Sequence, residues 1–240
     1  MSVDLEWEEL QTAIADSVAS YCSDRCGEQV ARDAFHEFPR DVWKGRADLG
    51  VLALGSGADG GPLEICAAVE SLGRALFPGP LAATFAAAGV LEGAARERLT
   101  SGEALVSLSA GGLIPWAAVA DVFLVLEGGR LFEAEPAGEI TAIETIGGEP
   151  WGRVALERVR TVGSAARTLA IHDMCVAAYT AACGNRLVEL TCDHVRTRKQ
   201  FGRAIGEFQA VAHPLANASM KLAAAKTLAR AAAFELASGS

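Results

Sequence analysis

The chain has 240 residues, of which 51% are hydrophobic, and it carries a formal net charge of −9 at pH 7. This composition excludes a disordered chain, and the acidic balance argues against broad nucleic-acid binding, which requires a basic surface. Because no apolar run reaches the roughly 20 residues of a membrane span and the acidic N-terminus lacks the form of a signal peptide, we expect a soluble cytoplasmic protein without a membrane partner.

The first part of the chain, residues 1–101, is expected to form an N-terminal helical domain. Its first helix has Asp4 as a candidate N-cap and four apolar residues at helical spacing, namely Leu5, Leu10, Ala13 and Val18. A helix is expected from about Leu63 to Leu76, where Pro78-Gly79-Pro80 ends it. The alanine-rich stretch from Leu81 to Arg98 is expected to form one more helix.

Residues 102–160 have the pattern of a reduced β domain. Three short aliphatic runs bounded by glycine pairs read as strands: Ala104–Ser109, Val122–Leu126 and Arg130–Ala134. The segment Glu127-Gly128-Gly129 is typical of a hairpin turn. We expect about five or six short strands here, the usual range for a sheet.

Residues 161–240 return to helix. The stretch from Ala165 to Lys199 contains no proline and predicts one helix of about 50 Å at 1.5 Å per residue. A final helix is predicted to begin with Pro214 in its first turn. Its apolar residues recur at intervals of three and four positions in turn and so form a seam along one face of the helix. They are Leu215, Ala218, Leu222, Ala225, Ala229, Ala232 and Leu236. Four charged residues off the seam are expected to be solvated: Lys221, Lys226, Arg230 and Glu235.

Two helices with an uncovered apolar seam imply a partner surface. The sequence predicts either a truncated chain or one that completes itself against another subunit.

The cysteines carry no metal-site or disulfide-scaffold spacing. The six are Cys22, Cys26, Cys66, Cys175, Cys183 and Cys192. Cys22 and Cys26 are one helical turn apart, as are His172 and Cys175, but neither pair has further partners at zinc-ligand spacing. We expect buried thiols that pack as small apolar side chains and no metal centre.

The corner between the two C-terminal helices concentrates binding chemistry. Arg198 offers a planar fork of donors that suits a phosphate pair, Gln200 offers a donor and an acceptor, and Phe201 offers a flat apolar surface. These residue types suit a ligand that is anionic at one place and aromatic at another, such as a dinucleotide. The alternative is a structural corner with a solvated arginine and core phenylalanines.

This corner resembles the R-x-Q-F-G-x-x-I-x-x-F-Q signature of the acyl-CoA dehydrogenase family. The matching positions are Arg198, Gln200, Phe201, Gly202, Ile205, Phe208 and Gln209. Two further segments are similar to family landmarks: Phe38–Leu52 to the N-terminal W-x-x-L-A-x-L-G helix, and Glu70–Pro80 to the E-x-L-G-R-A-L-x-P-G-P segment. The similarity covers the N-terminal half and the last third of the chain and thins between them.

The resemblance implies an acyl-CoA dehydrogenase-like fold with an N-terminal helical domain, a reduced β domain and an incomplete C-terminal bundle. It also implies FAD as cofactor and the α,β-desaturation of an acyl-CoA thioester. In the family, the signature meets a flavin bound mainly by the neighbouring subunit. By this resemblance Arg198 would pair with the FAD pyrophosphate, while Gln200, Phe201, Ile205 and Gln209 would lie along the adenosine portion.

The sequence departs from the family pattern at the catalytic centre. The T-E-P-x-x-G-S-D strand has no counterpart at Leu108–Gly112, and the W-x-T/S-N element is missing around Trp116. Where some members carry a glutamate early in the first bundle helix, this chain has His172, beside Asp173. His172 either takes a proton or is a helix histidine without catalytic duty, so no catalytic residue is assigned.

The preferred interpretation is a short, partner-dependent member that resembles the degenerate subunits of heteromeric dehydrogenases acting on bulky acyl-CoA substrates such as steroid side chains. Its partner would be an identical or a different acyl-CoA dehydrogenase subunit. The alternative is a non-catalytic helical scaffold without its own flavin. A third possibility keeps the fold but changes the reaction to that of an oxidase or a flavin-dependent monooxygenase.

Overall fold

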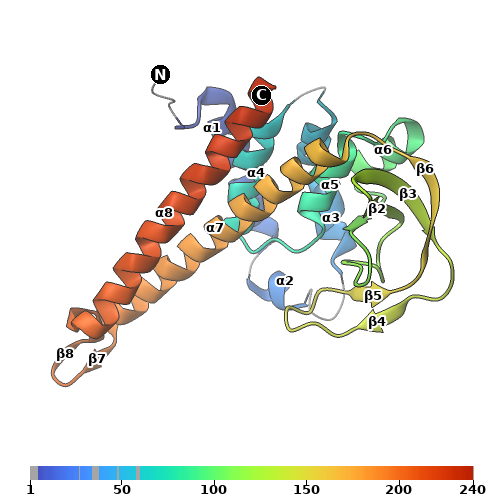
Figure 1. Ribbon diagram of the computed structural model, residues 1–240. Helices are drawn as coiled ribbons and strands as arrows, with labels where there is room; N and C mark the ends of the chain where they lie inside the picture. The colour runs from blue at the N-terminus through green and yellow to red at the C-terminus, as the bar shows by residue number, and fades with distance from the viewer. Residues whose placement is uncertain (1–4, 27, 34–37, 48, 58–59, 240) are drawn as a thin grey trace.

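The computed structural model describes residues 5–26, 28–33, 38–47, 49–57 and 60–239. Helices at both ends of the chain flank a small β region, and the last two helices extend away from the body as a pair (Figure 1). The predicted fold class, mainly α with a small β domain, is therefore confirmed. Within the described ranges, each helix is too short or too polar to cross a lipid bilayer.

The N-terminal region consists of short helices around a buried core. They are α1 (Glu9–Arg25), α2 (Glu28–Asp33), α3 (Arg40–Ala47), the 3-10 helix η1 (Val51–Ser56), α4 (Pro62–Arg74), α5 (Leu81–Ala88) and α6 (Gly93–Thr100). Because α1 begins at Glu9, Leu5 precedes the helix, and Leu10 is exposed, so only part of the predicted apolar face is correct. The predicted cap Asp4 lies outside the described residues.

The prediction of one helix from Leu81 to Arg98 is wrong, because α5 ends at Ala88 and α6 starts at Gly93. Gly93 has a φ of 55°, a left-handed conformation that a glycine adopts without strain. The break turns the chain so that Leu91 is completely buried beneath the sheet region. Alanine content alone therefore overestimated helix continuity, since the glycines on either side of Leu91 set the boundary.

The β region contains a four-stranded sheet and a separate pair. The sheet has the order β1-β2-β3-β6, formed by β1 (Val106–Ser109), β2 (Val122–Glu127), β3 (Arg130–Pro136) and β6 (Leu156–Thr161). Strand β4 (Thr141–Ile143) pairs with β5 (Trp151–Arg153). The predicted hairpin is confirmed, since Glu127 faces Arg130 across a two-residue turn. The expectation of five or six strands within residues 102–160 also agrees with these six.

Two long helices complete the chain. Helix α7 (Ala165–Thr197) has 33 residues and α8 (Gln209–Ser238) has 30, and they are joined by β7 (Lys199–Gln200), β8 (Arg203–Ala204) and the short 3-10 helix η2 (Ile205–Glu207). The uninterrupted first helix was predicted correctly. The position of Pro214 was not, because α8 begins at Gln209 and the proline lies inside the helix rather than in its first turn.

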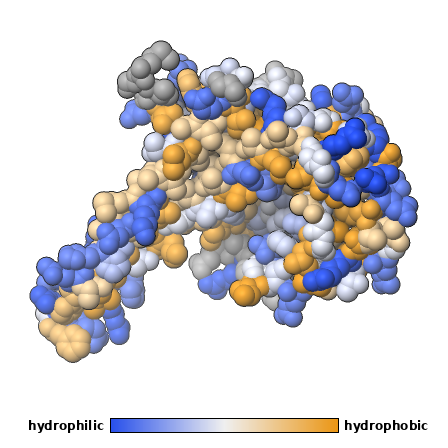
Figure 2. Space-filling model, viewed as in Figure 1, coloured by the Kyte–Doolittle hydropathy of each residue, from blue (hydrophilic) through white to orange (hydrophobic). Residues whose placement is uncertain are grey.

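One half of this helix pair packs against the body of the protein and is called the supported half. The other half projects from the body and is called the free half. On α7 the buried residues run from Ala165 to Ala181, after which only Val195 is buried, and on α8 only Ala229 and Ala233 are buried. Residues 190–220, here called the arm, therefore project from the body, as Figures 1 and 2 show. The seam residues of α8 are all buried or half-buried, and α8 packs against α7 and α4, so the expectation of an uncovered seam is wrong for these residues.

The supported half is fixed by ion pairs to α4. Arg230, predicted to be solvated, is instead only 14% exposed, and its guanidinium donates to both carboxylate oxygens of Glu70 at 2.8 and 2.7 Å. It also stacks on the ring of Trp7 at 4.0 Å. About three-quarters of the way along α7, Glu189 accepts two hydrogen bonds from Arg74 at 2.7 and 2.6 Å. These contacts join segments that are distant in sequence, which is why periodicity did not predict them.

Candidate functional site

The free end of the arm is built around a tight hairpin. Strands β7 and β8 pair Gln200 with Arg203, which leaves Phe201 and Gly202 as the two turn residues. Both have positive φ angles, 53° and 82°. Glycine adopts this conformation freely, whereas for a bulky L-residue it costs about 1–2 kcal/mol. The fold therefore holds Phe201 in a strained backbone conformation at the turn.

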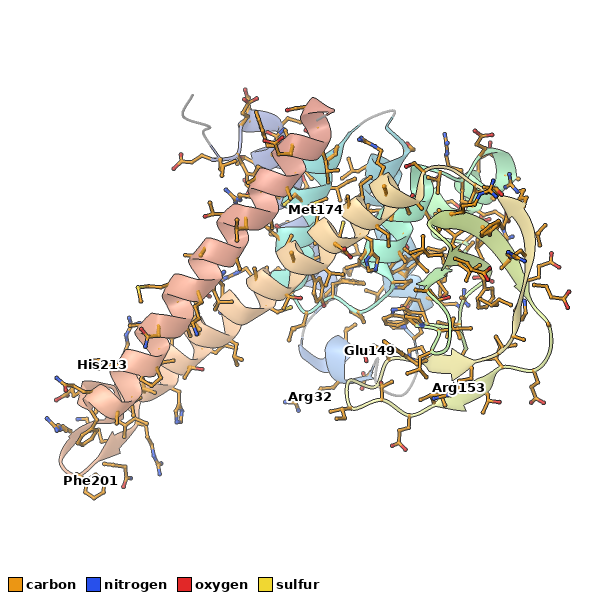
Figure 3. The ribbon with its side chains drawn as sticks, viewed as in Figure 1. Arg32, Glu149, Arg153, Met174, Phe201 and His213 are labelled. Carbon is orange, nitrogen blue, oxygen red and sulfur yellow. The ribbon has the colours of Figure 1, made fainter. Side chains whose placement is uncertain are left out.

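The strained turn holds the aromatic ring of Phe201 in contact with solvent. Phe201 is 93% exposed and lies at the far end of the arm (Figure 3). Its ring meets Phe208 edge-on with 6.2 Å between centroids, and the Arg203 guanidinium lies 4.1 Å from the centroid of Phe208. An exposed phenylalanine at a strained position contributes nothing to a core, and strain of this kind is concentrated at ligand sites.

The other residues predicted for this site lie beside Phe201. Arg198 and Gln200 are exposed, Gln209 is the exposed first residue of α8, and Ile205 is half-buried with its N–H bound to the Arg198 carbonyl at 2.9 Å. No hydrogen bond or ion pair joins the Arg198 guanidinium to another group within the described ranges. The structure thus brings all five predicted residues to one end of the molecule.

The tip is also the basic end of an acidic chain. Residues 194–213 carry four cations, Arg196, Arg198, Lys199 and Arg203, and one anion, Glu207, in a chain whose net charge is −9. Free guanidinium donors suit a pyrophosphate, and an exposed ring suits a nucleobase or ribose face. The residues present therefore fit the diphosphate and adenosine parts of a dinucleotide such as FAD.

A second candidate site is a cavity of about 710 Å³ between the helical core and the β region. Its lining is mostly apolar and comes from α4, the loop after it, α5, the β region and α7. This volume is within the range of ligand pockets, about 300–1,000 Å³. Two lining residues, Leu76 and Trp116, have positive φ angles of 52° and 59°. Together with Phe201, they are the non-glycine residues with positive φ in the described chain, so all such strain falls at the two candidate sites.

The cavity contains few groups that could exchange a proton. Burial raises the pKa of the Cys175 thiol well above its ordinary value, so Cys175 stays protonated. The Tyr179 hydroxyl donates to the Phe77 carbonyl at 2.8 Å. Glu149 lies on the exposed β4–β5 loop at the rim, where Thr145 Oγ1 donates to its carboxylate at 3.2 Å. His172, on α7, is the remaining basic group of the lining.

Sequence reasoning found the arm tip but not the cavity. Trp116 was noted only because the family's W-x-T/S-N element is missing around it, Leu76 only as part of the segment Glu70–Pro80, and Glu149 was not singled out. The proline-glycine cluster after α4 and the glycine pair Gly147-Gly148 both line the cavity, and such turn clusters are the signal that could have indicated it. As for metals, no group of three or more His, Cys, Asp or Glu in the described part of the chain could hold an ion.

Two family models match the chain. The acyl-CoA dehydrogenase N-terminal domain matches residues 8–97, and the acyl-CoA dehydrogenase C-terminal domain matches residues 162–240. Among curated proteins, the acyl-CoA dehydrogenase IpdE2 of Mycobacterium tuberculosis is 27% identical over 90% of this chain and 73% of its own length.

Solved structures with the same fold include a subunit of the ChsE4-ChsE5 complex from Mycobacterium tuberculosis, with a TM-score of 0.84 and 23% identity over 98% of this chain and 80% of that one. PigA, solved with FAD and proline, gives a TM-score of 0.81 and 18% identity over 99% of this chain and 81% of its own. At these identities, the likeness to the solved structures establishes the fold alone.

Proposed function

Because the chain belongs to the acyl-CoA dehydrogenase family, we propose that it acts in the FAD-dependent α,β-desaturation of an acyl-CoA thioester, as a subunit that completes a flavin site with a partner. The observation that carries the proposal is the arm tip, where Arg198 is exposed and unpaired and Phe201 is held in a strained conformation. Neither feature stabilises the chain itself, so both are available to a ligand.

The distance between the two candidate sites supports the proposal of a partner. His172, in the cavity lining, and the end of α7 at Thr197 are separated by about 38 Å of helix at 1.5 Å per residue. Figure 3 draws Phe201 and Glu149 in separate parts of the molecule. A nucleotide held at the tip is too far away to serve this chain's own cavity, so the tip serves the cavity of another subunit. The ChsE4-ChsE5 complex is a precedent for two different subunits in this fold.

The roles proposed for the tip residues are those that the family resemblance implies, and the chemistry of their side chains is compatible with them. Arg198 would bind the pyrophosphate, and Gln200, Phe201, Ile205 and Gln209 would orient the adenosine part. When bound, FAD supplies the redox chemistry, accepting the hydride from the β-carbon of the thioester. The chain's own contribution is to bind the cofactor.

The direct test compares two arginines near the same hairpin. Arg198→Ala removes the unpaired guanidinium, whereas Arg196→Ala removes one that lies 3.4 Å from Asp193 on the last turn of α7. The full chain, tagged and isolated with its native assembly, is measured for FAD content by absorbance. We expect Arg198→Ala to lose most of the flavin and Arg196→Ala to retain it. Equal retention in both variants would contradict the proposal.

The alternative, a scaffold without flavin, is favoured by one observation. Several α8 residues exposed to solvent are uncharged, including Met220 at 65% and Leu228 at 70%. If the isolated assembly is colourless, stable and unaffected by added FAD, this alternative replaces the enzymatic one. A yellow assembly that an acyl-CoA bleaches supports the dehydrogenase, and rapid reoxidation by oxygen identifies an oxidase instead.

A further inference from the structure

The 710 Å³ cavity has a bulky residue in a strained backbone conformation on each of its two sides. Leu76 follows α4 on the helical side with a φ of 52°, and Trp116 lies between β1 and β2 on the β side with a φ of 59°. Glycine or asparagine adopts such a conformation more readily than a bulky residue does. The backbone therefore does not explain why these two positions hold large apolar side chains.

Packing within the chain does not explain Leu76 either, because this residue is 54% exposed. Its backbone is fixed by the turn after α4, where the Leu76 N–H donates to the Gly73 carbonyl at 3.0 Å. The next residue, Phe77, is held from both sides: its N–H donates to the Leu72 carbonyl at 2.9 Å, and its carbonyl accepts from the Tyr179 hydroxyl at 2.8 Å. An exposed apolar side chain on a fixed turn at the cavity is available to an apolar ligand.

Trp116 is held by an aromatic cluster that reaches the core. Its ring meets Phe38 edge-on, and Phe38 in turn contacts Trp43, with 5.8 Å between ring centroids in both contacts. Trp43 is only 1% exposed. The Trp116 carbonyl also accepts hydrogen bonds from the backbone N–H groups of Val119 and Ala120, both at 3.0 Å. Trp116 is therefore a fixed part of the cavity wall.

The lining beside these two residues is rigid as well. It includes Pro78, Pro80 and Pro115, whose rings fix the backbone torsion φ. A wall that does not adapt discriminates by clashing with the wrong ligand as well as by contacting the right one. The size and shape of the ligand therefore decide how well this cavity binds it.

We propose that Trp116 and Leu76 are specificity-determining residues that limit the width of the acyl group that the cavity accepts. They contact the acyl group from the β side and the helical side and take no part in bond making or breaking. In an apolar pocket, one methylene group of fit or misfit changes discrimination by about 10–200-fold. The inference rests on the proposed function for the thioester class of the ligand, since the mostly apolar lining alone indicates only an apolar ligand.

Two unreactive probes that differ in width test this role. S-octyl-CoA and S-(2-cyclohexylethyl)-CoA carry the same number of carbons on the sulfur, but the second is wider and shorter. Both are thioethers without the carbonyl that makes α-hydrogens acidic, so neither can be desaturated. The full chain, isolated with its native assembly, is titrated with each probe, and the ratio of the two dissociation constants is measured. A merely destabilised fold weakens both probes alike, and sites on a partner are the same in every variant.

Trp116→Asn removes the ring and places a residue that tolerates positive φ. We expect the ratio to shift toward the wider probe by about tenfold, the low end of the range for an apolar pocket. Leu76→Asn should shift it severalfold in the same direction, because a smaller side chain is removed. Thermal unfolding establishes that each variant folds. If Trp116→Asn does not fold, Trp116→Phe takes its place, with an expected severalfold shift from the smaller ring.

Ile146→Asn is the matched control. Ile146 is fully exposed and adjoins Gly147 of the lining without belonging to the lining itself. The same change from an apolar residue to asparagine should therefore leave the ratio of the dissociation constants unchanged.

Three results would overturn the proposal: no binding of either probe to the unaltered assembly, an unchanged ratio in the Trp116 or Leu76 variants, or an equal shift in Ile146→Asn. None of them affects the flavin proposal, which depends on Arg198 and is measured by FAD content. Conversely, loss of the flavin proposal leaves the titration intact, because binding of a thioether involves no oxidation.

Discussion

The same helix pair carries two arginines in opposite environments. At the supported end, Arg230 is 14% exposed, paired with Glu70 and stacked on Trp7. At the free end, Arg198 is exposed and has no partner within the described residues, beside an aromatic ring that is 93% exposed. Both ends combine a guanidinium with an aromatic ring, but one combination is satisfied within the chain and the other is not.

The difference indicates how the molecule divides its tasks. Contacts that hold the helix pair onto the body are complete in the folded chain, so their loss should reduce stability. The tip contributes little to the fold, so changes there should leave stability intact and affect only what binds. Each prediction below tests one side of this division.

The largest effect is expected for Arg230→Ala. Removing the guanidinium leaves the carboxylate of Glu70, which is 12% exposed, with Lys226 at 3.5 Å as its remaining cation and the indole N–H of Trp7 at 3.3 Å. Breaking one partner of a buried ion pair costs about 3 kcal/mol, because the other charge is left uncompensated. Urea unfolding followed by circular dichroism measures the loss. Arg198→Ala is the control and should change the free energy of unfolding by less than about 0.5 kcal/mol. Similar losses in both variants would remove the distinction between the two ends.

A smaller loss is expected where α4 and α7 approach most closely. A Cβ at Gly73 would lie 2.5 Å from the backbone oxygen of Tyr179, so Gly73→Ala forces the helices apart and should cost about 1–3 kcal/mol. The control, Gly184→Ala, meets only the end of the Leu222 side chain, which can move. Because alanine also favours helix, that variant should be near neutral. If Gly184→Ala is less stable than Gly73→Ala, the close approach of α4 and α7 at Gly73 is not the cause of the loss.

At the tip, replacing the bulky residue Phe201 should not destabilise the folded chain. Phe201→Asn places in the turn a residue that tolerates positive φ, so the free energy of unfolding should stay the same or rise by up to about 1 kcal/mol. FAD content of the native assembly should fall in the same variant. A drop in stability would instead identify Phe201 as a structural residue.

The smallest effect concerns the pair Arg74 and Glu189. The hydrogen bonds from Arg74 lower the pKa of Glu189 below its ordinary value of 4.5. A carboxyl group whose folded pKa is lowered stabilises the fold above its unfolded pKa, and this contribution is lost as the pH falls through the folded pKa. Both side chains are about half-exposed, so we expect about 0.2–1 kcal/mol at neutral pH.

The measurement is the difference in unfolding free energy between the unaltered chain and Glu189→Gln as a function of pH. The difference should be constant near neutral pH and shrink in acid, below about pH 4.5. If the difference in unfolding free energy instead grows as the pH falls, the pair does not lower the pKa of Glu189.

Local sequence patterns were sufficient for several of the elements and for the proximity of the tip residues to one another. The long helix α7 follows from a proline-free stretch, the β2–β3 hairpin from its glycine pair, and the five tip residues adjoin because they are close in sequence. The boundary between α5 and α6 was missed, because alanine content outweighed the glycines at the break. Whether the tip residues hold a flavin stays a prediction.

By itself, the sequence determined a mainly helical chain with a β insertion and a basic, aromatic corner, since each of these depends on neighbours within a few residues. Only the tertiary structure decided that Arg230 is buried, that Leu76 and Trp116 are strained, and that His172 lines a cavity. Those features depend on distant segments, as where Arg230 contacts Glu70, 160 residues away, and donates to the Leu5 carbonyl, 225 residues away. The burial of a charge depends on a partner that helical periodicity does not encode.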